Sequence, residues 1–124
     1  TVMKSPCFVL SGINAGANLG VNLMVSGTFA AAREAAVHDV PAMALSHYRK
    51  PDVPKTWQHT PSWTSEILNR FADTVKAKPG GGLIADRHLW NVNLPAHDPA
   101  SNPPEHKECE VDRRPIIRHA MQDN

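Results

Sequence analysis

The stretch from Ser11 to Thr28 contains no charged residue, and no acidic residue precedes Glu34. The whole chain has only two cysteines, 6% aromatic residues and a net charge of +1. Such balanced charge gives no electrostatic preference for a nucleic acid polymer or a membrane surface. No apolar run approaches the roughly 20 residues of a membrane span, and no signal-peptide pattern opens the chain. We therefore expect a cytoplasmic protein that binds neither partner, with Cys7 and Cys109 as reduced thiols.

Several kinds of site have little support in the sequence. No two of the seven histidines have the i,i+4 spacing of a helical zinc site, so we expect them in loops or on the surface. The three tryptophans, Trp57, Trp63 and Trp90, are too dispersed for a stacking platform, and the last two are expected in the core. Residues 80–82, three glycines, follow a helix pattern and lack the lysine of a phosphate loop. Ser26 has no nucleophile-elbow pattern around it, which argues against a serine hydrolase.

The first half of the chain reads as a strand, a loop, a helix and a second strand. The apolar run 7–10 predicts a strand buried on both faces that ends at Ser11. An alanine-rich helix is predicted over 27–37, ending before Pro41, with Asp39 in the left-handed cap position. Residues 41–46 predict the second strand, which pairs parallel to the first in a right-handed β-loop-α-β unit.

The second half predicts an amphipathic helix over 61–77, with Thr60 as its N-cap, and a strand over 89–94. Residues 1–95 are thus expected to form one α/β domain. Five of the eleven prolines lie in the last thirty residues, so 96–124 is predicted to be an extended arm or loop region. Since the chain enters a strand almost at once, without an initiator methionine, we expect it to be a piece of a longer protein.

The loop that follows the first strand has the chemistry of a phosphate and cation site. Asn14, Asn18 and Asn22 recur at every fourth position among glycines, and neutral amide oxygens suit a hard cation. Ser26 has the profile of an N-cap, so the helix start at 26–28 offers hydroxyl groups and free backbone N–H groups to a phosphate. Ligands of open α/β sheets bind at the carboxyl ends of the strands, which is where this loop begins.

Each of these residues also has an ordinary structural interpretation. An asparagine that follows a strand is most often a turn residue, and Ser26 taken alone is most often a plain helix cap. A magnesium site usually needs one or two carboxylates, which this stretch lacks. A cation bound at Asn14 would therefore need carboxylates from elsewhere in the protein.

Two sequence blocks resemble the central signature of the survival protein SurE family. The first is SGINAGANLG, and SGTFAAAREAA follows it after five residues. The later segments PAMALS and WNVNLP stand where that family has its next strands, and the resemblance is collinear from about Pro6 to Pro95. The tail from Pro99 to Met121 resembles the family only loosely.

The resemblance implies a Rossmann-like three-layer α/β/α fold with a mostly parallel sheet, of which the N-terminal part and the C-terminal end are missing here. It also implies a phosphatase that uses a divalent metal, Mg²⁺ or Mn²⁺, to hydrolyse nucleoside 5′- and 3′-monophosphates. By position, Asn14 matches the metal-binding asparagine, and the phosphate-binding residues match Asn18, Ser26, Gly27 and Thr28. The family forms dimers or tetramers through its C-terminal arm, which implies a homodimer or homotetramer for the full-length protein.

This chain also departs from the family pattern. The family's other metal ligands, two adjacent aspartates and a serine, are upstream of the part represented here. An acidic pair of the family is replaced by Val21 and Asn22, its usual tyrosine is Val25, and Asp39 stands where glycine is common. The alternative is therefore a non-catalytic nucleotide-binding or assembly module with the same fold.

Overall fold

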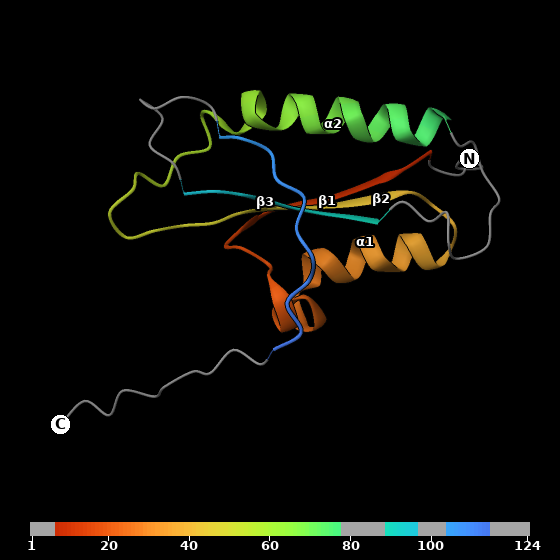
Figure 1. The fold of residues 1–124 in the computed structure, drawn as a ribbon, viewed down its shortest axis with the longest axis horizontal. Helices are drawn as coiled ribbons and strands as arrows, with labels where there is room; N and C mark the ends of the chain where they lie inside the picture. Colours follow the sequence, from red (N-terminus) through yellow and green to blue (C-terminus); the bar gives the residue numbers. More distant parts are fainter. Residues whose placement is uncertain (1–6, 78–88, 97–103, 115–124) are drawn as a thin grey trace, which may run out of the picture.

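The computed structural model describes residues 7–77, 89–96 and 104–114. One parallel sheet has the strand order β1-β2-β3, and its strands are β1 (Val9–Ala15), β2 (Ala42–His47) and β3 (Leu89–Leu94). Figure 1 shows helix α1 (Gly27–Val37) on one face of the sheet and helix α2 (Thr60–Ala77) on the other. The predicted Rossmann-like α/β/α layering is thus confirmed.

Alanines let α1 lie close to its face of the sheet. Ala32 on the helix packs against Ala42 and Ala44 of β2, and all three are fully buried. Phe29 and Val9 extend this cluster at its margin. The small side chains explain why the alanine-rich sequence suits a helix that covers a sheet closely.

The opposite layer is built from larger side chains. Phe71 of α2 packs against Met43 and Leu45 of β2, and its ring meets that of Trp90 edge-on with centroids 5.4 Å apart. All six residues of β2 are buried, as expected for a central parallel strand with helices on both faces. Burying Phe71 and Met43 contributes roughly 1.5–3 kcal/mol each by the transfer of apolar side chains from water.

The predicted helices and the later strands are confirmed to within one residue. Ser26 caps α1, since its Oγ accepts the backbone N–H of Phe29 at 3.1 Å. Asp39 takes the left-handed conformation, with φ of 59°, just beyond the helix end. The chain can therefore turn from α1 into β2 within four residues.

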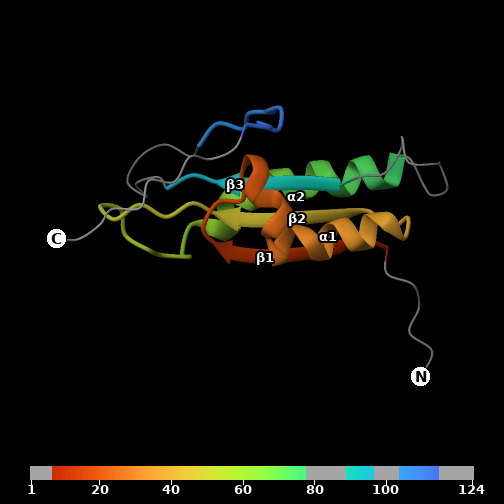
Figure 2. The ribbon, with the colours of Figure 1, turned by 90° about the horizontal axis from the view of Figure 1, so that it is seen from below.

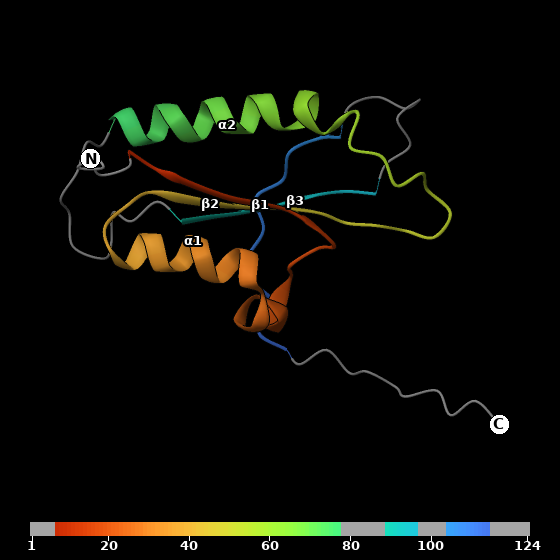
Figure 3. The same cartoon turned by 180° about the vertical axis from the view of Figure 1, so that it is seen from behind.

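The first strand differs from the prediction in length and burial. β1 extends to Ala15 through a register shift between Ser11 and Asn14, so Asn14 lies within the strand rather than beyond it. Its residues are half-buried or exposed, because β1 forms one edge of the described sheet while β3 forms the other (Figures 2 and 3). The expectation that it is buried on both faces is wrong for this chain.

Two local features were not anticipated. The apolar insert of the glycine-asparagine loop forms a 3₁₀ helix, η1 (Gly20–Val25), which buries Leu23. His47 ends the central strand and is only 5% exposed, so the expectation of loop or surface positions is wrong for this histidine. The rings of Trp57 and Trp63 both contact the His47 ring, so these two tryptophans lie close together in the fold.

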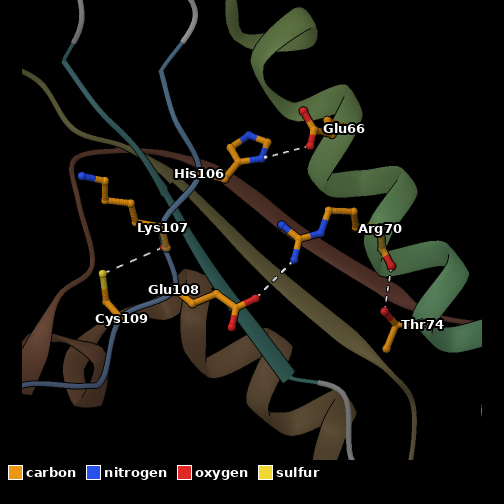
Figure 4. Close-up of polar contacts among 7 residues, drawn as sticks. All are labelled: Glu66, Arg70, Thr74, His106, Lys107, Glu108 and Cys109. Atoms are coloured by element: carbon orange, nitrogen blue, oxygen red, sulfur yellow. Dashed lines mark hydrogen bonds and ion pairs between the residues drawn. The ribbon is translucent and has the colours of Figure 1, made fainter.

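The segment 104–114 crosses the β3 edge from α2 to η1 (Figures 1 and 2). Two contacts join it to α2: Arg70 forms an ion pair with Glu108 at 3.2 Å, and the His106 ring lies 3.7 Å from the Glu66 carboxylate (Figure 4). At its other end the Asp112 carbonyl lies against Gly20 of η1. Residues 104–114 form no helix or strand. The rest of the predicted arm and the triple glycine lie outside the described residues, apart from Ala96.

No helix among the described residues has the length and apolar character needed to cross a membrane.

Candidate functional site

A row of polar side chains crosses the sheet at the carboxyl ends of its three strands. Asn14 of β1 is in register with Ser46 of β2, and Ser46 is in register with Asn93 of β3. Alternation along β2 places Ser46 on the same face as Ala42 and Ala44, which is the face that α1 covers. The sheet thus changes from apolar to polar at the end where the chain leaves each strand.

Asn18 joins this row to the loop after β1. Its side-chain Nδ2 donates to Ser46 Oγ at 2.7 Å, and its backbone N–H donates to Asn93 Oδ1 at 2.8 Å. Its carbonyl accepts from the amides of Asn91 at 3.0 Å and Asn93 at 3.1 Å. Asn18 is 7% exposed, so these bonds fix the loop onto β2 and β3.

The side-chain amide of Asn14 donates one hydrogen bond and leaves its oxygen as an acceptor. Its Nδ2 donates to the carbonyl of Gly16 at 2.9 Å, which orients the amide and leaves Oδ1 as the acceptor. Gly16 has φ of 136°, a conformation that favours glycine, and it turns the chain directly after β1. Asn14 as a whole is half-buried.

The start of α1 supplies the second element of the site. Because α1 runs antiparallel to the strands, its N-terminus lies at the end of the sheet where the strands finish (Figure 1). Ser26 Oγ takes one N–H of the first turn, and the other early N–H groups of a helix have no intrahelical acceptor. Gly27 is exposed, and a side chain added there would meet no atom within 4 Å. The helix start is therefore open to an anion, which its dipole favours.

The predicted site residues occupy two adjoining groups. Asn14 and Asn18 border Ser46, whereas 26–28 follow at the far end of η1. In the part of the chain that the structure describes, no hydrogen bond links Asn14 or Asn18 directly to residues 26–28. The two groups share the same end of the sheet and the same face, which is the arrangement expected for a ligand with two contact points.

Three polar residues of this site were missed from the sequence. Ser46, Asn91 and Asn93 were taken only as strand positions, although they hold Asn18 in place. The available signal was the pair of asparagines at alternate positions of a predicted strand, since both must lie on one face. Asn91 also carries a buried Oδ1 with no hydrogen-bond partner among the described residues.

The site has few charged groups. Among residues 7–77, 89–96 and 104–114, no three His, Cys, Asp or Glu side chains are placed to hold a metal ion. Asn14 Oδ1 fits one neutral ligand position of a hard cation, but a complete magnesium site usually includes carboxylates. The residues present thus fit one part of such a site.

Comparison with known proteins identifies the family. The profile of the family described as survival protein SurE matches residues 1–117. The chain belongs to the SurE family. A protein from Nostoc sp. strain PCC 7120 is 43% identical over 109 residues, which cover 88% of this chain and 45% of that relative.

Other SurE proteins give the same result. The protein named 5′-nucleotidase SurE from Paramagnetospirillum magneticum is 43% identical over 92 residues, covering 74% of this chain and 32% of that protein. The crystal structure of the SurE protein from Aquifex aeolicus matches with a TM-score of 0.57 and 29% identity, over 77% of this chain and 34% of that one. The chain thus spans less than half the length of these relatives.

Proposed function

We propose that this SurE chain carries the phosphate-binding part of a metal-dependent phosphomonoesterase that hydrolyses nucleoside 5′- and 3′-monophosphates. The observation that carries the proposal is that Asn14, Asn18 and the open start of α1 lie on one face of the sheet, at the carboxyl end of its strands. The names of the relatives, 5′-nucleotidase SurE, support nucleotides as the substrate class. The proposed protein is cytoplasmic and forms a homodimer or homotetramer.

Each residue has a role in the proposed site. Ser26, Gly27 and Thr28 bind the phosphate oxygens through backbone N–H and hydroxyl groups, where the helix dipole stabilises negative charge. Asn18, whose amide and backbone are bound to Ser46 and β3, positions the loop beside that phosphate. Water attacks phosphorus, and the ester oxygen leaves with a proton taken from solvent or from the attacking water.

Asn14 Oδ1 would hold the divalent cation, Mg²⁺ or Mn²⁺, together with carboxylates from outside this chain. When bound, such an ion withdraws electron density from the phosphoryl group and neutralises its charge. In this proposal the carboxylates are an aspartate pair upstream in a longer protein. The chain covers 45% and 32% of the length of two relatives, and a longer protein of that kind has further residues that could supply these carboxylates.

A second candidate is a non-catalytic nucleotide-binding or assembly module. Among the described residues, no cluster of three His, Cys, Asp or Glu side chains could hold a metal ion, which favours this candidate. Phosphate release from nucleoside monophosphates by the full-length protein separates the two. We expect release that needs added Mg²⁺ or Mn²⁺ and stops with a chelator, and nucleotide binding without any release would instead support the module.

The 124-residue chain by itself should release negligible phosphate under the same conditions. Metal-dependent turnover by the purified chain would show that it holds a complete metal site, contrary to the proposal.

A further inference from the structure

The backbone carbonyl of Asn18 accepts hydrogen bonds from two side chains of β3. Asn93 Oδ1 accepts the Asn18 N–H at 2.8 Å, and Asn93 Nδ2 donates to the Asn18 carbonyl at 3.1 Å. One side chain therefore pairs both backbone groups of Asn18, as a neighbouring strand would. Asn91 Nδ2 donates to the same carbonyl at 3.0 Å. Without Asn91, the carbonyl would still be paired with Asn93.

Asn91 makes this second bond at a cost to the folded protein. Its Oδ1 is buried and has no hydrogen-bond partner in the part of the chain that the structure describes. An acceptor that loses water on burial without gaining a partner costs free energy, and such a group in a folded protein calls for an explanation. The net gain from one extra bond to a paired carbonyl is smaller than that cost or similar to it. Stability therefore does not explain why an asparagine occupies this position.

The place of Asn91 in the sheet connects it to the candidate site. Asn91 is in register with Ala44 of β2, and Ala44 packs against Ala32 of α1. Because side chains alternate along a strand, Asn91 and Asn93 share the α1 face, which carries the polar row. The amide of Asn91 thus reaches from the sheet to Asn18, the residue proposed to position the loop beside the phosphate.

The loop around Asn18 depends on such bonds for its orientation. Gly16 and Gly20 lie two residues before and two residues after Asn18, and their φ angles are 136° and 51°. Glycine has more backbone freedom than other residues, so the loop can turn at both points. The bonds from β2 and β3 to Asn18 therefore determine how its peptide group is held.

We propose that Asn91 is a positioning residue, which holds the Asn18 peptide in the orientation that binding of a nucleoside monophosphate requires. The inference rests on the proposed function. It adds a residue that acts on the phosphate through Asn18 without contacting the phosphate itself.

Asn91→Leu in the full-length protein tests this role, because leucine is close to asparagine in size and forms no side-chain hydrogen bond. The KM for AMP should rise about threefold or more, since a misplaced loop binds the substrate less well. The midpoint of urea unfolding should stay at or above that of wild type, because the variant no longer buries an unpaired oxygen. A purely structural residue would show the reverse, with a lower midpoint and an unchanged KM.

Val92→Ala is the matched control. Val92 follows Asn91 in the strand but lies on the opposite face, where it packs against the cluster of Met43, Leu45 and Phe71. Truncation should lower the urea midpoint and leave the KM for AMP unchanged, which shows what instability alone does to KM. The inference is overturned if the KM of Asn91→Leu does not exceed that of Val92→Ala. A urea midpoint of Asn91→Leu below that of Val92→Ala would also overturn it, because the bonds of Asn91 would then serve the fold.

Binding of AMP separates this inference from the proposed function. If the full-length protein binds AMP but releases no phosphate from it, the proposed function fails, and titration calorimetry replaces the kinetic measurement. Binding of AMP that is about threefold or more weaker in Asn91→Leu than in Val92→Ala would still support the positioning role. Equal binding by the two variants would overturn it, and a wild-type protein that binds no AMP would overturn both proposals.

Discussion

The side-chain amide of Asn18 donates to the hydroxyl of Ser46 over 2.7 Å, at a point where both residues are buried. This bond fastens the loop after β1 to the central strand, and the backbone of Asn18 adds bonds to Asn91 and Asn93 on β3. The loop that carries the candidate site is therefore held by side chains from β2 and β3.

Asn18→Ala should destabilise the protein. Truncation leaves the Ser46 hydroxyl without its donor, and a buried polar group without a partner costs about 1–3 kcal/mol. Urea unfolding of the full-length protein measures the free energy of unfolding of each variant. The exposed Asn69→Ala is the matched control and should stay within about 0.5 kcal/mol of wild type. Equal stability of the two variants would show that the Asn18 network contributes little.

Ser26 allows stability and phosphate binding to be separated. Ser26→Ala removes the cap of α1 and should cost about 0.5–2 kcal/mol. Ser26→Asp keeps a capping oxygen and suits the helix dipole, so stability should be near wild type. Its negative charge repels phosphate, so hydrolysis of AMP should fall at least tenfold. A fully active Ser26→Asp variant would contradict phosphate binding at this helix start.

Substitution by alanine should destabilise the protein at Gly12 but not at Gly27. Gly12 has φ of 132°, and a Cβ there would collide with the carbonyl of Leu45 on β2. Backbone strain of this kind costs about 1–3 kcal/mol, and the collision adds to it. Gly27→Ala meets no atom within 4 Å and should leave the unfolding free energy within about 0.5 kcal/mol of wild type. Similar losses in both variants would count against the close contact between β1 and β2.

The stability of the folded protein should depend on the protonation of His47. Burial and Arg49 lower its pKa below the ordinary 6.5, despite an opposing bond with the Pro95 backbone. At a pH between the pKa values of His47 in the two states, the unfolded protein binds more protons than the folded protein. The free energy of unfolding is therefore highest above pH 6.5 and falls as the pH drops through the pKa that His47 has in the folded protein. Urea unfolding between pH 5 and 7.5 should show a smaller pH dependence for His47→Gln than for wild type, and equal slopes would contradict this linkage.

Much of the fold could be predicted from local patterns. The buried run of β2, the alanines of α1 and the apolar spacing of α2 each imply an element and the face it covers. The length of β1 could not be predicted, because Ser11, Gly12 and Asn14 favour a turn and are extended only by pairing with β2. The 3₁₀ helix η1 likewise depends on the burial of Leu23, a tertiary contact.

The site itself could be predicted only in part. Loop chemistry indicated Asn14, Asn18 and the start of α1, since glycine, asparagine and a helix cap have local signatures. The roles of Ser46, Asn91 and Asn93 depend on strand order and register, which one sequence does not reveal. The same holds for the convergence of Trp57 and Trp63 on His47.

The most direct test of the proposed site is phosphate release from AMP by the full-length protein carrying Asn14→Ala, measured across a titration of Mn²⁺. Loss of the Asn14 oxygen should weaken metal binding, so activity should fall at least tenfold at low Mn²⁺ and recover in part as Mn²⁺ is raised. Asn69→Ala should behave as wild type throughout. Wild-type activity of Asn14→Ala at every Mn²⁺ concentration would show that Asn14 is not a metal ligand and would contradict the proposed site.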